Sequence, residues 1–268
     1  SGTSWGGPRT IKNLSTVDTY GIQAVLLPGL SDKVMVCWVQ IAIQGALSPD
    51  VWCSISVDNG EIFKAPVKVN DVSGTVLNPQ IAVDNTNLYV AMEDSKKGII
   101  LDQSPLGGSN IAFSSDLSLG AKQGSTRHKM LADGTGRVFV IWDEVAYNQN
   151  LAVMANASKN YGGSWLSAAK QVDLDVVDGD SSNASIAAWP GGRVVAAWAD
   201  TSRGRPDIYV GYSDDDGVTW SNPVSRVSST NSGLNRSSTP FVAVDPSNKN
   251  VYVAWQDFRF GGKGDLYF

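Results

Sequence analysis

The sequence predicts an all-β fold, a five-bladed β-propeller of four-stranded antiparallel blades. An apolar strand pattern centred on a large side chain occurs five times, at steps of 54, 50, 56 and 57 residues. A self-similar period of this length, about 50 residues, is typical of propellers and repeat arrays. No helical hydrophobic period of useful length occurs, and the connecting segments are rich in Ser, Asn, Gly and Asp. The five copies are Val34–Trp38, Leu88–Met92, Val138–Trp142, Val194–Trp198 and Val251–Trp255.

The clearest repeat unit runs from Val194 to Val227. An apolar run centred on Trp198 is followed by a polar loop and then by an alternating run, Asp207–Tyr212, which predicts two strands and a hairpin. A tight polar turn, Ser213–Trp220, leads into a short last strand. One unit therefore supplies the outer three strands of a four-stranded blade.

The turn of this unit has the pattern Ser-x-Asp-x-Gly-x-x-Trp. An Asp at the head of a turn accepts hydrogen bonds from later backbone N–H groups, and Gly supplies the positive φ that closes the turn. We expect the aromatic residue to pack between strands. The residues concerned are Ser56, Asp58, Gly60 and Phe63 in the first unit, Ser158, Asn160, Gly162 and Trp165 in the third, and Ser213, Asp215, Gly217 and Trp220 in the fourth.

We interpret these turns as folding devices. In the second unit the corresponding stretch, Ser104–Gly108, has lost the acid. The acidic run Asp214–Asp216 offers fewer oxygen ligands, over a shorter spacing, than a calcium loop needs. We therefore predict no metal site and no cofactor.

Taken in order, the chain divides into five blades within a single domain, 1–268. The first strands of the blades are predicted at Ile22–Leu27, Asn78–Val83, Arg127–Leu131, Asn183–Ala187 and Thr239–Ala243. The predicted blades cover about 19–70, 76–119, 126–172, 183–227, and 238–268 together with 1–13.

The fifth blade is predicted to be shared by the two ends of the chain. Gly264–Phe268 matches Pro206–Val210, and Gly2–Pro8 matches Gly217–Pro223. The N-terminal strand would thus complete the last blade, and closing a ring removes exposed sheet edges. By this register the turn between the two ends lacks a few residues. Either the chain was cut from a longer one, or its natural ends lie in this turn.

The two cysteines are placed to face each other. If Asp50 pairs with Gln40, then Cys37 lies opposite Cys53 on neighbouring antiparallel strands, so a disulfide is geometrically possible. Such a bond predicts an oxidising, extracellular (secreted) or cell-surface location. The alternative is two free, buried cysteines.

Composition excludes several classes of function. The net charge is -5 and the sequence pI is about 4.8, and no basic stripe interleaved with aromatics occurs, which argues against nucleic-acid binding. No apolar run reaches the length of about 18 residues that membrane insertion requires. We therefore expect no nucleic acid and no membrane insertion.

The turn motif resembles the Asp-box of the BNR-repeat, sialidase-like β-propellers. This resemblance implies a propeller fold, and in sialidases it also implies an Arg-Ile-Pro motif, an arginine triad, an acid/base Asp and a Tyr–Glu pair. Here Arg9 lies in Gly7–Ile11 without that motif, we count five blades where sialidases have six, and we can nominate no Tyr–Glu pair.

The face that carries the loops between the second and third strands is the predicted ligand face. Guanidinium groups there are suited to carboxylate-bearing sugars or proteins. The ligand-binding candidates are Arg127, His128, Tyr147, Arg203, Arg236 and Arg259. Three of them have a structural alternative: His128 as a hydrogen-bonded structural residue, and Arg203 and Arg259 as loop partners of Asp200 and Asp257.

A glycosidase mechanism would need two carboxylates flanking a sugar bond. The weak catalytic candidates are Glu144, Asp200 and Asp257, with Asp143 as a further partner. Because these acids recur at matching blade positions, a repeated structural role explains them more simply. We therefore predict a non-catalytic extracellular or cell-surface recognition propeller whose partner is a carbohydrate or a surface protein. A sialidase-like exo-glycoside hydrolase is the alternative, and a structural module of a larger surface protein or assembly is the third.

Overall fold

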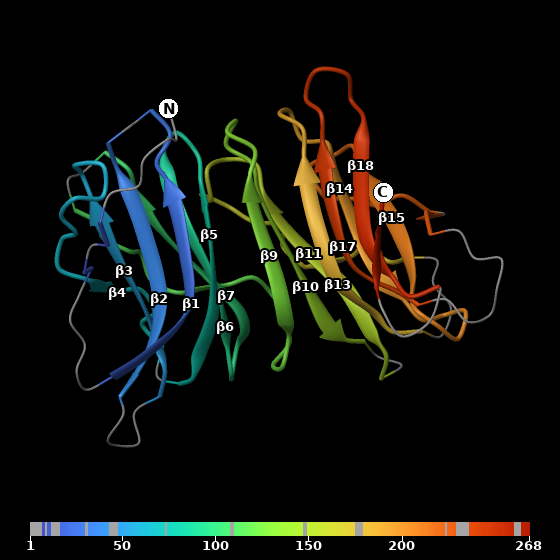
Figure 1. Cartoon of the computed structure of the whole chain (residues 1–268), viewed down its shortest axis with the longest axis horizontal. Coiled ribbons are helices and arrows are strands. Elements are labelled where there is room, and N and C mark those ends of the chain that lie inside the picture. Colours follow the sequence, from blue (N-terminus) through green and yellow to red (C-terminus); the bar gives the residue numbers. More distant parts are fainter. Residues whose placement is uncertain are drawn as a thin grey trace.

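The computed structural model confirms the all-β prediction, with five antiparallel sheets arranged side by side (Figure 1). It describes residues 7–8, 10–11, 17–29, 32–42, 48–72, 74–107, 110–146, 149–174, 179–222, 224–228, 236–259 and 264–268. Within these residues there is no helix long and apolar enough to cross a membrane.

Each sheet is built from strands that are consecutive in the chain. The first contains β1 (Val17–Leu26), β2 (Val34–Ala42), β3 (Asp50–Ser56) and β4 (Val67–Lys68). The second contains β5 (Val76–Val83), β6 (Asn87–Asp94), β7 (Gly98–Pro105) and β8 (Leu117–Ser118). The third contains β9 (Thr126–Ala132), β10 (Val138–Val145), β11 (Leu151–Ser158) and β12 (Lys170–Gln171). The fourth contains β13 (Ser181–Ala188), β14 (Val194–Asp200), β15 (Asp207–Ser213) and β16 (Ser225–Arg226), and the fifth β17 (Ser237–Val244), β18 (Val251–Asp257) and β19 (Asp265–Tyr267).

These sheets are consistent with the blades of a propeller, and we number them as blades 1 to 5. Blade 5 has three strands within the described residues. The strand expected from residues 1–13 falls mostly outside the described part, and Gly7, Pro8, Thr10 and Ile11 lie in no strand. Closure of the ring is therefore not shown.

The hydrophobic core lies between neighbouring blades. One buried cluster joins blades 1 and 2, and others join blades 2 and 3, 3 and 4, and 4 and 5. Every residue of β14 is buried. A strand covered on both faces reads as a continuous apolar run, and this is why the second strand of each repeat carries the strongest sequence signal.

The first strands of all five blades share one irregularity. Each shifts register against its neighbour opposite the large central residue of the second strand. At that point, which we call the bulge, each first strand has a residue with positive φ. These residues are Gly21 (61°), Asn78 (51°), Arg127 (52°), Asn183 (57°) and Thr239 (47°). Gly and Asn tolerate this conformation, whereas it strains β-branched Thr239.

The Asp-box turns have the expected internal hydrogen bonds. In blade 4, Ser213 Oγ accepts from Gly217 N at 2.9 Å, and Asp215 Oδ1 accepts from Thr219 N at 2.8 Å. Gly217 has the positive φ that closes the turn, at 79°, and Trp220 is buried beside it. The turns headed by Asp58 and Asn160 repeat these bonds.

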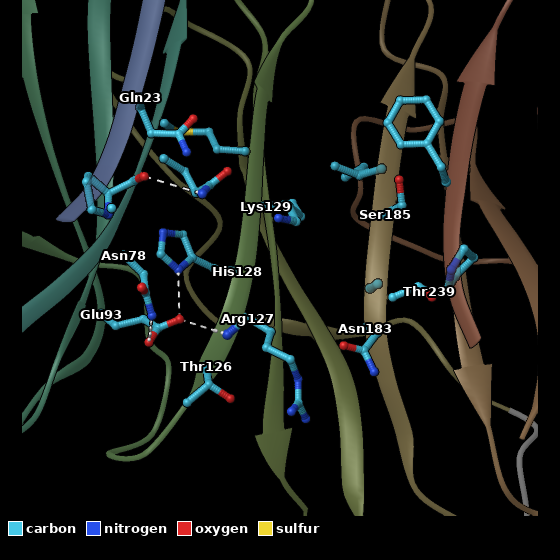
Figure 2. Close-up of a pocket in the computed structure, with 18 residues that line it drawn as sticks. Gln23, Asn78, Glu93, Thr126, Arg127, His128, Lys129, Asn183, Ser185 and Thr239 are labelled. Atoms are coloured by element: carbon cyan, nitrogen blue, oxygen red, sulfur yellow. Dashed lines mark hydrogen bonds and ion pairs between the residues drawn. The ribbon is translucent and has the colours of Figure 1, made fainter. Parts of the chain in front are cut away.

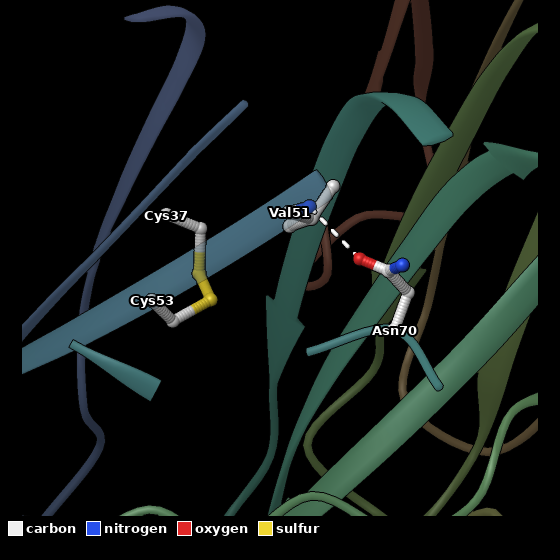
Figure 3. The surroundings of a disulfide bond; sticks show 4 residues. All are labelled: Cys37, Val51, Cys53 and Asn70. Atoms are coloured by element: carbon white, nitrogen blue, oxygen red, sulfur yellow. Dashed lines mark hydrogen bonds between the residues drawn. A yellow bond between two sulfur atoms is a disulfide. The ribbon is translucent and has the colours of Figure 1, made fainter. Parts of the chain in front are cut away.

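The predicted cysteine register is also present. Cys37 pairs with Cys53 and Trp38 with Trp52 between β2 and β3, and the two cysteines are joined by a disulfide (Figure 3). Both cysteines are fully buried. The bond links the two central strands of blade 1, directly beside the core that this blade shares with blade 2.

Candidate functional site

The first strands of the five blades line one open cavity of about 890 Å³ (Figure 2). This volume lies within the range of small-molecule sites, about 300–1,000 Å³. The cavity lining combines amides, hydroxyls and a few charged groups with apolar residues such as Met130, Ile186 and Phe241. Its polar and aromatic residues include Gln23, Asn78, Glu93, Arg127, His128, Lys129, Asn183, Ser185, Thr239 and Phe241.

Glu93, from the end of β6, is the carboxylate that lines this cavity. It accepts hydrogen bonds from Arg127 N and from Asn78 Nδ2, each at 2.8 Å, and it lies 3.4 Å from His128 Nδ1. Burial alone would raise its pKa, but the hydrogen bonds from His128 and Asn78 outweigh burial and leave the pKa of Glu93 below its usual value. Glu93 is thus held ionised between blades 2 and 3.

His128 is held at both of its ring nitrogens. Nε2 lies 3.0 Å from the carbonyl oxygen of Ala91, and Nδ1 faces Glu93. Which nitrogen donates depends on the tautomer, but both contacts hold the ring in one orientation. The side chain is 1% exposed, and we assign it to joining blades 2 and 3 rather than to touching a ligand.

Asp143 repeats this arrangement one blade further on. Its Oδ2 accepts from Arg127 Nε at 2.5 Å and from Asn183 N at 2.9 Å. The carboxylate is fully buried, and burial raises its pKa despite the hydrogen bonds from Asn183 and Arg127. The Arg127 side chain remains 46% exposed, so part of its guanidinium is available at the edge of the cavity.

Lys129 adds a second positive charge to the lining. It is exposed and extends from β9 (Figure 2). No carboxylate in the described part of the chain lies within ion-pair distance of its ammonium group. Because Arg127 is paired with Asp143, Lys129 is the cation of this lining that no described carboxylate balances directly.

The other ligand candidates that the structure describes do not line the cavity. Arg203 Nε donates to the Tyr209 hydroxyl at 3.2 Å, the Arg236 guanidinium lies 5.6 Å from the centroid of a neighbouring ring, and Arg259 forms an ion pair with Asp257 at 2.7 Å. Tyr147 lies outside the described residues. Of the five candidates within the described residues, Arg127 and His128 are the two that the cavity brings together.

The weak catalytic candidates hold loops. Glu144 accepts from Lys122 N and Trp142 Nε1, and these bonds, together with the ammonium of Lys122, lower its pKa against the opposing effect of burial. Asp200 accepts from Ser181 Oγ at 2.7 Å and from Ser202 N at 2.8 Å.

Asp257 is likewise an acid that binds its own loop, and the hydrogen bond from the Arg259 side chain lowers the pKa of Asp257 to about 2. The expected pairing of Asp257 with Arg259 is present. The expected pairing of Asp200 with Arg203 is wrong, since among the described residues Arg203 contacts Tyr209 instead. None of these three acids lines the cavity.

Sequence reasoning missed Glu93, Asn78, Lys129 and Asn183. A signal was present one position before the loop-binding acids Glu144, Asp200 and Asp257. Sequence reasoning named Asp143 at that position, but not Glu93. Directly after the large central residue, the five blades carry Val39, Glu93, Asp143, Ala199 and Gln256. An acid occurs there in only two of the five blades. Glu93 and Asp143 therefore do not belong to a loop-capping pattern that every repeat shares.

Comparison with known proteins extends this description. No protein-family model and no curated protein sequence matches the chain. Among solved structures, a Hadza microbial sialidase superposes with a TM-score of 0.55 at 14% identity, covering 89% of this chain and 52% of the sialidase. The chain has the fold of the sialidase-like Asp-box propellers.

Two further structures support the same fold for this propeller. A protein of unknown function from Dyadobacter fermentans matches with a TM-score of 0.58 at 13% identity, over 91% of this chain and 76% of that protein. The GH93 α-L-arabinofuranosidase of Fusarium graminearum, solved with arabinobiose, matches with a TM-score of 0.57 at 11% identity, over 89% and 77%. The propeller spans about half the length of the Hadza sialidase. At these identities the likeness concerns the fold alone.

Proposed function

We propose that this propeller is a non-catalytic recognition module that binds a carbohydrate in the cavity between its first strands. The observation that carries the proposal is the cavity itself. Its volume of about 890 Å³ is lined by amide, hydroxyl and cationic groups. Such a lining can donate to and accept from several sugar hydroxyls at once, and a few well-placed polar groups are what give a concave site its specificity.

An aromatic side chain supports a sugar ligand. Phe241 lines the cavity and is 67% exposed, so its ring offers an apolar face to the C–H groups of a sugar ring. The proteins that share the fold include the arabinofuranosidase solved with arabinobiose. The fold is therefore compatible with a sugar ligand.

The acids of the site favour recognition over hydrolysis. A two-carboxylate mechanism needs both groups to face the scissile bond. Asp143 is fully buried, and Glu93 is 12% exposed and already accepts from two donors. One observation keeps a sialidase-like exo-glycoside hydrolase as the second candidate: the pKa of Asp143 is raised while that of Glu93 is lowered, and opposed shifts of this kind occur in acid/base pairs.

We also propose that the protein works outside the cell or at its surface, and that its N-terminal segment completes blade 5. The disulfide between Cys37 and Cys53 supports an oxidising location. The match of Gly2–Pro8 to Gly217–Pro223 supports the N-terminal strand. Both proposals fit a recognition module of a surface protein.

The test is a glycan-array screen, with aryl-glycoside and sialoside hydrolysis assays on the same sample. We expect saturable binding without turnover, weakened at least about tenfold in Phe241→Ala, whose ring supplies the apolar face. Arg203→Gln is the control, because Arg203 lies outside the cavity lining. Turnover that is lost in Asp143→Asn would establish the hydrolase instead. If the protein neither binds a glycan nor hydrolyses a glycoside, the two negative assays would favour a structural module of a larger assembly.

A further inference from the structure

The two acids beside the cavity take part in one repeated arrangement. In each case a carboxylate accepts a side-chain donor from the bulge of its own blade and a backbone N–H from the bulge of the next blade. Glu93 of blade 2 accepts from Asn78 Nδ2 and from Arg127 N, each at 2.8 Å. Glu93 therefore fixes the strained bulge of blade 3 to blade 2.

Blade 3 uses the same arrangement with different residues. Here the carboxylate is Asp143, in the place of Glu93. It accepts from the Arg127 side chain of its own blade, as Glu93 accepts from the Asn78 amide. It also accepts from Asn183 N of blade 4, as Glu93 accepts from Arg127 N. Charge-assisted hydrogen bonds of this kind are stronger than neutral ones. Two donors thus converge on one oxyanion at each of these two blade junctions.

The arrangement stops at the junction of blades 4 and 5. Ala199 occupies the position of the acid, because it pairs with Ser182 in the register in which Asp143 pairs with Thr126. The equivalent donors are the Asn183 side-chain amide and the N–H of Thr239. Alanine has no acceptor to offer them. We call the space between these two donors the acceptor gap.

The acceptor gap opens on the cavity. Asn183 and Thr239 both belong to the cavity lining and lie on neighbouring strands (Figure 2). The Asn183 amide has only a 3.3 Å contact with the Ser182 hydroxyl among the described residues. Thr239 holds a φ of 47° that strains a β-branched side chain, and strain of this kind concentrates at functional sites.

We infer that the acceptor gap binds the carboxylate of the ligand, so that an acidic sugar such as a uronate is the ligand class. The inference rests on the proposed function and adds the group that is recognised. A ligand carboxylate would complete the arrangement that Glu93 and Asp143 complete elsewhere. Lys129, which no described carboxylate pairs, adds a favourable charge on the same cavity.

Blade 1 does not offer a second gap of this kind. There the position of the acid is occupied by Val39, and the bulge residue is Gly21, which has no side chain to donate. A β-carbon added to Gly21 would lie 3.4 Å from the Val39 side chain. Apolar atoms therefore fill the space that a carboxylate would need.

The first experiment compares Asn183→Gly with Asn59→Gly. Both positions have positive φ, so glycine keeps the backbone, but only Asn183 lies at the gap. Binding of D-galacturonate and of D-galactose is titrated by calorimetry. We expect Asn183→Gly to weaken galacturonate binding by about tenfold or more, the cost of one hydrogen bond to a charged group, and to leave galactose binding unchanged. Equal losses for both sugars, or no loss for either, would overturn the inference.

The second experiment installs the missing acid with Ala199→Asp. We expect a Tm no lower than that of the unaltered protein, because hydrogen bonds from the two donors of the gap would offset the burial of the new carboxylate beside Ile208 and Trp255. We also expect loss of the preference for galacturonate. Sodium acetate is then titrated into the unaltered protein against sodium chloride, with the Thr239 amide resonance as the readout. If neither sugar binds but acetate still shifts that resonance, the proposed carbohydrate function fails while the acceptor gap stands. If acetate leaves the resonance unmoved and Ala199→Asp lowers the Tm, the acceptor gap itself is refuted.

Discussion

Two neighbouring positions on the second strand carry acids with different roles. Acids at one position accept hydrogen bonds from the adjoining loops, and acids at the other accept hydrogen bonds from the next blade. Glu144, Asp200 and Asp257 lie two residues after the large central side chain and accept from the loops beside them. Glu93 and Asp143 lie one residue after it. Successive residues of a strand point to opposite faces, and side chains of the earlier position reach the bulge of the next blade.

Asp102, in β7, is a buried acid whose protonation links stability to pH. Burial, followed by the nearby carboxylate of Asp116, raises its pKa to about 8. The unfolded chain ionises near pH 3.9 at this residue, so folding loses stability as the pH rises from about 4 to about 8. We predict that Asp102→Asn removes this loss and raises the Tm at alkaline pH by several degrees, measured by thermal unfolding across the pH range.

The comparison at acidic pH serves as the internal control for Asp102. Below about pH 4 Asp102 is protonated in both the folded and the unfolded chain, so the amide replaces a neutral group of the same shape and the Tm should change little. A variant that is destabilised equally at acidic and alkaline pH would show instead that the carboxyl group makes a specific favourable contact.

At the scale of the element, the Asp-box turn of blade 4 can be tested against that of blade 3. Asp215 accepts from Thr219 N and Thr219 Oγ1, and Asn160 accepts from Ser164 N in the same geometry. We predict that Asp215→Ala lowers the free energy of unfolding by about 1–2 kcal/mol, because the turn loses its acceptor, whereas Asp215→Asn costs clearly less. Urea unfolding of the two variants measures the difference, and equal costs would contradict the account.

The same turns show which elements could be predicted from the sequence. The central strands were predictable because burial on both faces leaves an apolar run, and the turns because Asp and Gly have specific backbone roles. The positive-φ bulges of the first strands could not be predicted from the sequence. Arg127 and Thr239 adopt positive φ, and neither residue type signals that conformation. The cavity lining depends on these bulges, so sequence reasoning located Arg127 and His128 but missed Glu93 and Asn183.

At the scale of the whole molecule, stability is distributed over the junctions between blades. Each buried cluster combines strands from two neighbouring blades. The second strands β6, β10 and β14 are almost fully buried. By contrast β18 is largely part-exposed, and Leu266 of β19 is 87% exposed within the described residues. Blade 5 is therefore the part whose stability depends on what covers its outer edge.

Hydrogen exchange can decide what covers that edge. Amides in buried central strands open only with the global free energy, so we expect β6, β10 and β14 to exchange most slowly. If the N-terminal segment completes blade 5 as proposed, β19 is also protected, and Trp5→Ala should speed exchange in β18 and β19 while leaving β6 and β10 unchanged. Because Trp5 matches Trp220, which is buried in blade 4, its loss should be felt mainly in its own blade. Rapid exchange of β19 in the unaltered chain would show that these residues do not supply the strand.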